Sequence, residues 1–142
     1  MKRLLLFVLS ISIFSCELDD NGNPNSSELS AAQLTEELIL SSGLRLVQFI
    51  EDGEDYTSEF SGFVFRFEPN GTVTASRGSQ SITGTYRVFR DDGETELEMT
   101  FSPTSFLNEF TDDWYFRGKS NNRITFEDDD DEDGLSRLVF EK

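Results

Sequence analysis

Hydrophobic and polar residues alternate with a period of two through most of the chain after residue 43. That period sends successive side chains to opposite faces of an extended backbone, so each alternating run predicts a β-strand. The runs are short, and residues that favour tight turns separate them, as in Glu68-Pro69-Asn70-Gly71 and Asp91-Asp92-Gly93. The apolar positions of the runs lie in Leu44–Glu51 and at Phe63, Phe65, Phe67, Val73, Ala75, Ile82, Tyr86, Val88, Leu97, Met99, Phe101, Trp114, Phe116, Ile124, Phe126, Leu138 and Phe140.

A helical pattern precedes the strands. Ser30 is followed three residues later by Gln33, the spacing of a capping box, and Leu34 and Leu38 stand four residues apart. The residues Ser41-Ser42-Gly43 interrupt this pattern. The sequence therefore predicts one short helix up to Leu40, whose apolar face must pack on the strands because a helix of about three turns is marginal alone.

The predicted strands number about eight, and no strand-helix-strand spacing separates them. Short antiparallel strands joined by tight turns are typical of a meander that closes on itself. We therefore predict an all-β fold, an antiparallel up-and-down β-barrel of about eight strands. Ser102-Pro103 breaks the alternation, and Phe106, Leu107 and Phe110 predict a helical turn or a packed loop at that point.

The first residues are typical of an export signal. Lys2 and Arg3 precede an apolar run from Leu4 to Phe14, which is shorter than the about 20 apolar residues of a membrane-spanning helix. Polar sequence begins directly after Cys16, and Ile13-Phe14-Ser15-Cys16 resembles a bacterial lipobox. That resemblance implies that Cys16 receives a diacylglycerol. The alternative interpretation is a simple secretory signal with an incidental thiol.

These features divide the chain into a signal peptide (1–15), a lipidated cysteine with an acidic flexible tether (16–29), and a barrel domain with its N-terminal helix (30–142). The tether has too little apolar content to offset the entropy of ordering it. Glu17, Asp19 and Asp20 resemble the acidic tag that directs many lipoproteins of Bacteroidota to the outer face of the outer membrane. We therefore expect a lipid-anchored, surface-exposed protein of the outer membrane; the alternative is a solvated linker without address value.

The amino-acid composition excludes several kinds of catalytic and metal site and argues against nucleic-acid binding. The 142 residues include 28 Asp and Glu against 12 Lys and Arg, for a net charge of −16, which argues against nucleic-acid binding. There is no His and one Cys, so a Ser/His/Asp triad, a Cys/His dyad and a His/Cys zinc site are excluded. Pairs of carboxylates are available, but no spacing selects one pair for catalysis. We expect a monomeric protein that is not an enzyme and has no cofactor.

One acidic run resembles a cation-binding loop. Asp129, Asp131 and Asp133 alternate before Gly134, as in the first half of a calcium loop. The twelfth position of that loop, which should be Glu, is Phe140. The run predicts weak Ca²⁺ binding at most, and the alternative is a solvated hairpin loop.

Several short pieces, in order, resemble a known family. They are Phe49-Ile50-Glu51-Asp52-Gly53, Tyr56-Thr57, Phe60, Gly62-Phe63-Val64-Phe65-Arg66-Phe67, Asn70-Gly71-Thr72-Val73, Thr83-Gly84-Thr85-Tyr86, Asp112-Asp113-Trp114 and Leu138-Val139-Phe140-Glu141-Lys142. Together they look like the lipocalin-like lipoproteins of Bacteroidota, over about residues 42–142. Lipocalins proper carry Gly-x-Trp on the first strand, where this chain has Leu44. The resemblance implies an up-and-down barrel and, loosely, small-molecule binding.

Two functions follow as hypotheses. In the first, the protein binds a small apolar or glycan-like ligand in the barrel or at its mouth. The candidate lining residues share inward-facing positions in the predicted strands, and they are Phe63, Phe65, Phe67, Tyr86, Val88, Leu97, Met99 and Trp114. In the second, these side chains fill the core, and the acidic face binds a basic partner or divalent cations.

Overall fold

The computed structural model describes residues 28–128 and 134–142, and its first element is the short helix α1 (Ala31–Leu40). The predicted capping box is present: the Gln33 N–H donates to Ser30 Oγ at 3.3 Å, and the Ser30 N–H donates to Gln33 Oε1 at 2.9 Å. Leu34 and Leu38 are fully buried against the strands, as their spacing predicts. Within the described part of the chain, no helix has the length and apolar character needed to cross a membrane.

The strands of the described residues form one antiparallel sheet. Their bounds are β1 (Leu44–Glu51), β2 (Glu54–Asp55), β3 (Val64–Phe67), β4 (Thr72–Arg77), β5 (Gln80–Asp91), β6 (Glu94–Thr100), β7 (Asp112–Ser120), β8 (Arg123–Asp128) and β9 (Ser136–Glu141). Two helical turns interrupt the series, α2 (Thr57–Phe60) between β2 and β3 and the 3-10 turn η1 (Asn108–Phe110) between β6 and β7. The second of these confirms the helical turn expected after Ser102-Pro103.

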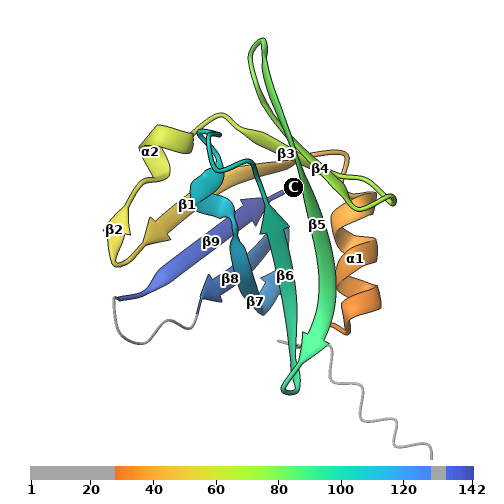
Figure 1. Ribbon diagram of the computed structural model, residues 1–142. Coiled ribbons are helices and arrows are strands. Elements are labelled where there is room, and N and C mark those ends of the chain that lie inside the picture. Colours follow the sequence, from red (N-terminus) through yellow and green to blue (C-terminus); the bar gives the residue numbers. More distant parts are fainter. Residues whose placement is uncertain (1–27, 129–133) are drawn as a thin grey trace, which may run out of the picture.

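The sheet closes because β1 pairs with both β3 and β9 (Figure 1). The remaining strands pair in chain order from β3 to β9, so eight strands make a closed up-and-down barrel, as predicted. The short strand β2 adds to the end of β1 through a tight turn at Asp52 and Gly53, and it stands outside the closed ring.

A β-bulge in β1 changes which of its side chains face inward. The pairing of β1 with β9 shifts register between Leu46 and Gln48. Leu44 and Leu46 are buried before the bulge, and Phe49 is buried after it. A bulge adds one residue and so reverses the alternation, which places Glu51, two residues beyond Phe49, on the inward side as well.

The core is a contiguous aromatic and aliphatic cluster inside the barrel. The rings of Phe65 and Phe140 lie 5.0 Å apart between centroids, and Phe67 and Tyr86 make an edge contact at 4.9 Å. The indole N–H of Trp114 donates to the carbonyl of Phe110 at 3.2 Å, which satisfies the polar atom of this buried side chain.

Gly84 has a defined packing role in β5. A Cβ at this position would lie 2.5 Å from the carbonyl oxygen of Thr100 and 2.7 Å from Cδ1 of Phe101. Glycine therefore lets the end of β6 and the Phe101 ring lie directly against β5.

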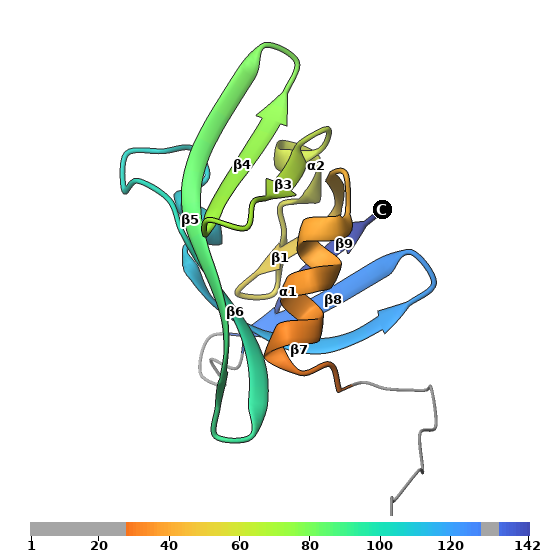
Figure 2. The same ribbon diagram turned by 90° about the vertical axis from the view of Figure 1, so that its right-hand side faces the viewer.

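The two ends of the barrel differ. Alternate connections of a meander lie at the same end, so the ends of β1, β4, β6 and β8 share one end with the starts of β3, β5, β7 and β9. The turn α2 and the β6–β7 connection lie at this end, and α1 lies on the opposite side of the barrel (Figures 1 and 2). We call the α2 end the mouth.

Candidate functional site

The eight candidate lining residues of the sequence analysis lie together inside the barrel. Phe63, Phe65, Phe67, Tyr86, Leu97, Met99 and Trp114 are buried, none being more than 8% exposed, and Val88 is partly buried against them. Arg77 covers the Phe63 ring from outside, with its Cζ 4.3 Å from the ring centroid. The structure thus brings the set into one packed cluster, and their contact with a ligand stays a prediction.

A hollow of about 420 Å³ lies at the mouth, beyond this cluster. It is formed by the end of β1, the turn α2 and the β6–β7 connection. Its lining residues are Phe49, Glu51, Asp52, Tyr56, Glu59, Phe60, Ser105, Phe106 and Glu109. The volume lies within the range of about 300–1,000 Å³ that is common for small-molecule sites, and the mouth of a barrel is a usual place for one.

Backbone hydrogen bonds fix the position of α2 against β1. The Tyr56 N–H donates to the carbonyl of Phe49 at 2.9 Å, and the Phe49 N–H donates to Thr57 Oγ1 at 3.0 Å. Asp55 Oδ1 accepts from the Thr57 N–H, two residues further along the chain, at 2.9 Å, as in an Asx turn. Because these bonds tie the two segments together, the side chains of Phe49 and Phe60 are held in a defined arrangement.

Aromatic rings form the apolar walls of the hollow. Phe49 and Phe60 make an edge contact with centroids 5.3 Å apart, and the rings of Phe60 and Phe106 lie 4.8 Å apart. Phe110 stacks on Phe49 at 4.4 Å from the core side. Phe49 and Phe60 are buried, whereas Phe106 is 45% exposed. A large apolar side chain that stays exposed beside a hollow is a feature of binding surfaces.

Glu51 lines the hollow and has a buried carboxylate oxygen. Its Oε2 is buried and has no hydrogen-bond partner among the described residues. Burial, followed by the nearby carboxylates of Asp52, Asp112, Glu109 and Asp128, raises the pKa of Glu51 to about 7. A buried carboxylate oxygen without a donor is unfavourable, so this group is suited to receive a proton or a positively charged or hydrogen-bonding ligand.

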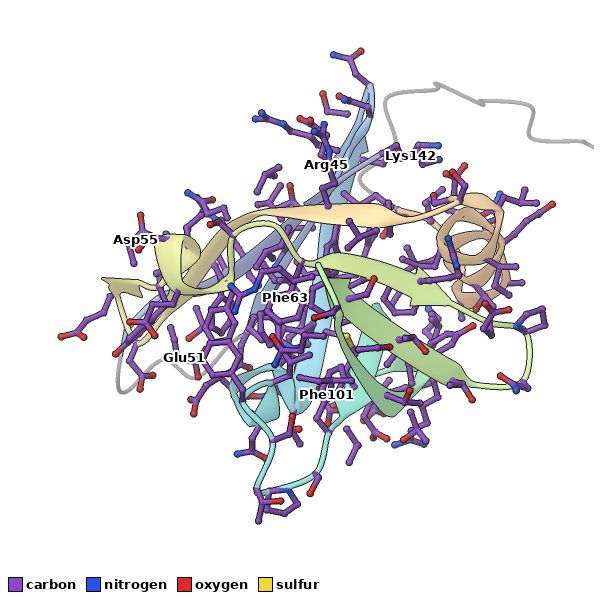
Figure 3. All side chains as sticks on the ribbon, turned by 90° about the horizontal axis from the view of Figure 1, so that it is seen from above. Arg45, Glu51, Asp55, Phe63, Phe101 and Lys142 are labelled. Carbon is purple, nitrogen blue, oxygen red and sulfur yellow. The ribbon has the colours of Figure 1, made fainter. Side chains whose placement is uncertain are left out.

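The charge around the hollow is one-sided. Four of the nine described residues that line it are Asp or Glu, and none of those nine is Lys or Arg. Figure 3 places Glu51 and Asp55 on one side of the molecule and Arg45 and Lys142 on another. At that second location the charges are paired, since Glu141 contacts Arg45 and Arg123, and Glu37 contacts Lys119 and Lys142.

Other hollows on the described surface have walls that carry charges of both signs. One of about 250 Å³ beside Leu29 includes Arg117, which contacts Glu94 at 2.6 Å. Another of about 340 Å³ on the outer face of β8 and β9 includes Arg137, which contacts Glu127 at 2.6 Å. The hollow at the mouth differs from both in combining aromatic walls with unmatched negative charge.

The predicted weak calcium site cannot be placed. Asp129, Asp131 and Asp133 lie outside the described residues. Within residues 28–128 and 134–142, no three Asp, Glu, Cys or His side chains converge in a way that could hold a metal ion. The carboxylates of the hollow therefore surround it without forming a metal cage.

Sequence reasoning did not single out the residues of this hollow. Glu51 follows apolar Ile50 at the end of a strand, and only the bulge between Leu46 and Gln48 turns it inward. Phe106 and Glu109 belong to a connection for which the sequence predicts only a helical turn or a packed loop. A signal was nevertheless present, because the apolar positions of Leu44–Glu51 change phase after Leu46, and a change of phase indicates a bulge.

The fold of this chain has a structural neighbour among known proteins. No protein-family model matches the chain, and no curated protein matches it. Among solved structures, the fold is similar to the crystal structure of a DUF4847 family protein from Bacteroides vulgatus, with a TM-score of 0.49 and 17% sequence identity. The similarity covers 75% of this chain and 95% of that one. We therefore argue the function from the residues of this chain alone.

Proposed function

We propose that this protein is a non-catalytic, lipid-anchored binding protein of the outer membrane, which holds a small ligand with an apolar part at the mouth of its barrel. The main support for this proposal is the hollow of about 420 Å³, whose walls include Phe49, Phe60 and Phe106. Phe106 remains 45% exposed there, so a ligand would cover apolar surface that now faces water. Burying such surface contributes roughly 25 cal/mol per Å².

The position of the described N-terminus fits an anchored protein whose site faces outward. The hydroxyl of Thr95 donates to the carbonyl of Leu29 at 2.8 Å, beside the β5–β6 hairpin. That hairpin lies at the end of the barrel opposite the mouth. A tether that leads back from Leu29 to a lipidated Cys16 would therefore leave the hollow directed away from the membrane and open to ligands from the medium.

Native mass spectrometry of the full chain, purified in a non-ionic detergent from its own host, tests the proposal. We expect one small molecule bound to the wild-type chain, and severalfold lower occupancy in Phe106→Ala, because that substitution removes one apolar wall of the hollow. Phe89→Ala is the matched control, since Phe89 lies on β5 against Arg87, outside the hollow. A bound mass that persists in Phe106→Ala, or no bound mass in the wild type, would contradict the proposal.

A second candidate function is binding of a basic protein partner by the acidic mouth. This function is favoured by the exposed Asp and Glu residues at the mouth, which are Asp52, Glu54, Asp55, Glu59 and Glu109. Attraction between exposed charges is screened over about 10 Å at 0.1 M salt. Binding of the basic partner should therefore weaken steeply as the salt concentration is raised.

An immobilised oligolysine peptide tests this second function. Changing Glu54, Glu59 and Glu109 to Gln should weaken capture severalfold more than the same change at Glu28, Glu36 and Glu68. The control residues are equally exposed but lie outside the mouth. Equal weakening in the two triple variants, or capture that does not change with salt, would rule the acidic mouth out as a docking surface.

A further inference from the structure

The walls of the hollow at the mouth combine two kinds of group that rarely occur together in a site for a neutral ligand. Three of its side chains are Phe, one is Tyr, and four are carboxylates. Aromatic faces attract cations through the ring quadrupole, and the attraction strengthens when the cation is partly desolvated. Carboxylates that lack a cationic partner attract the same kind of ligand by charge.

Glu51 provides an acceptor that the protein itself leaves unused. Its Oε2 is buried without a hydrogen bond among the described residues, although Glu51 lines the hollow beside Phe49. A neutral apolar ligand would bury this carboxylate further and leave it without a donor, which is costly. A ligand with an N–H donor and a positive charge would instead pair with it.

The rings near the hollow already accept a cation from the protein on one side. The guanidinium of Arg77 lies 4.3 Å from the centroid of Phe63 and 5.7 Å from that of Phe106. Its Nη1 donates to the backbone carbonyls of Glu59 and Ser61, not to a carboxylate. Arg77 is not among the residues that line the hollow, and within the described part of the chain it forms no salt bridge with a carboxylate there.

A metal ion is a poorer match for the same residues. No three carboxylates within the described part of the chain converge in a way that could hold a metal. Hard cations such as Ca²⁺ require six to eight oxygen ligands at short distance. Dispersed carboxylates around aromatic walls suit a larger ion with an apolar body.

We propose that the hollow binds a small organic cation, an ammonium group on an apolar body, with the apolar part against Phe49, Phe60 and Phe106 and the ammonium group at Glu51. This inference rests on the proposed function, because it names the class of ligand that the same hollow takes. The four carboxylates set the preference for positive charge, and the aromatic walls set the preference for an alkyl or aryl body over a hydrated inorganic ion.

Isothermal titration calorimetry of the full chain in non-ionic detergent tests the preference for charge at pH 8. The probes are 3,3-dimethylbutylamine, which is protonated at that pH as alkylamines are, and 3,3-dimethylbutan-1-ol, which carries a neutral donor on the same apolar body. We expect the ammonium probe to bind at least about tenfold more tightly than the alcohol. Glu51→Gln should lower this preference for the ammonium probe severalfold, as expected for removal of one of the charge–charge interactions while the other three carboxylates remain.

Glu36→Gln is the matched control, because it removes the same charge from an exposed position on α1, on the opposite side of the barrel. It should leave the tenfold preference intact. Equal binding of both probes by the wild type would overturn the inference on charge while leaving the hollow as a binding site. Saturable binding of neither probe would overturn both the inference and the hollow as the site.

Discussion

Phe65→Ala is expected to lower the free energy of unfolding by about 3–5 kcal/mol, the usual cost of removing a fully buried Phe. Phe65 has no exposed surface, and its ring lies 5.4 Å from Phe110 and 5.0 Å from Phe140. Phe65 belongs to β3, and these two partners come from η1 and β9, so the ring connects segments that are far apart in the sequence. The cavity left by Ala is bordered by a closed sheet that cannot collapse easily, which places the cost in the upper part of the range for core substitutions.

Urea unfolding followed by the fluorescence of Trp114, the single tryptophan of the chain, measures this loss. Phe89→Ala is the control, because it deletes the same ring from the outer face of β5 and should cost less than about 1.5 kcal/mol. The result also tests the first hypothesis from the sequence, in which Phe65 lines a ligand cavity. A loss below about 1 kcal/mol for Phe65→Ala would contradict a packed core and favour an open cavity inside the barrel.

Glu51→Gln is expected to make the protein more stable than the wild type at pH 8 and equally stable near pH 4.5. The pKa of Glu51 is raised from its ordinary value of 4.5 to about 7, so the folded state favours the protonated acid. When folding raises the pKa of a carboxyl group, its contribution to stability is fully present below the pKa of the unfolded state. That contribution is lost as the pH rises through the pKa of the folded state. The free energy of unfolding of the wild type should therefore include a contribution that declines between about pH 4.5 and pH 7. The Glu51→Gln variant should lack that contribution.

The expected difference at pH 8 is about 1–2 kcal/mol. The full shift would correspond to about 3 kcal/mol, and solvent screening of this partly exposed group reduces that value. Other carboxyls titrate in the same range, so the measured quantity is the difference between variant and wild type from urea unfolding at several pH values. Glu36→Gln, which makes the same change at an exposed position on α1, is the control for the loss of one carboxylate. A Glu51→Gln chain that is less stable than the wild type at pH 8 would show that the ionised carboxylate is stabilising, contrary to the account.

The barrel could be predicted from the sequence because its determinants are local. Alternation in runs such as Phe63, Phe65 and Phe67 fixes which face is buried, and turns such as Glu68-Pro69-Asn70-Gly71 set the reversals between neighbouring strands. In an up-and-down meander, each strand pairs with the next one along the chain, so local signals are sufficient to predict the pairing. The capping box at Ser30 and Gln33 likewise needs only residues three apart.

The hollow could not be predicted because it depends on segments brought together only by closure of the sheet. Phe49, Phe60 and Phe106 come from β1, α2 and the β6–β7 connection. Glu51 faces the hollow through the bulge in β1, and its pKa is raised first by burial and then by nearby carboxylates, among them Asp112 of β7 and Glu109 of η1. The sequence pointed to strand residues of the interior, whereas the exposed ring and three of the four carboxylates of the hollow lie in connections, where alternation carries no information.

A crystal structure of the full chain, purified from its own host with its ligand retained, tests the ligand site directly. We expect electron density for a small molecule at the mouth, in contact with Phe49, Phe60 and Phe106 and with a donor at Glu51. Density for a ligand among Phe65, Phe67 and Trp114 inside the barrel, or a hollow closed by its own side chains, would contradict it.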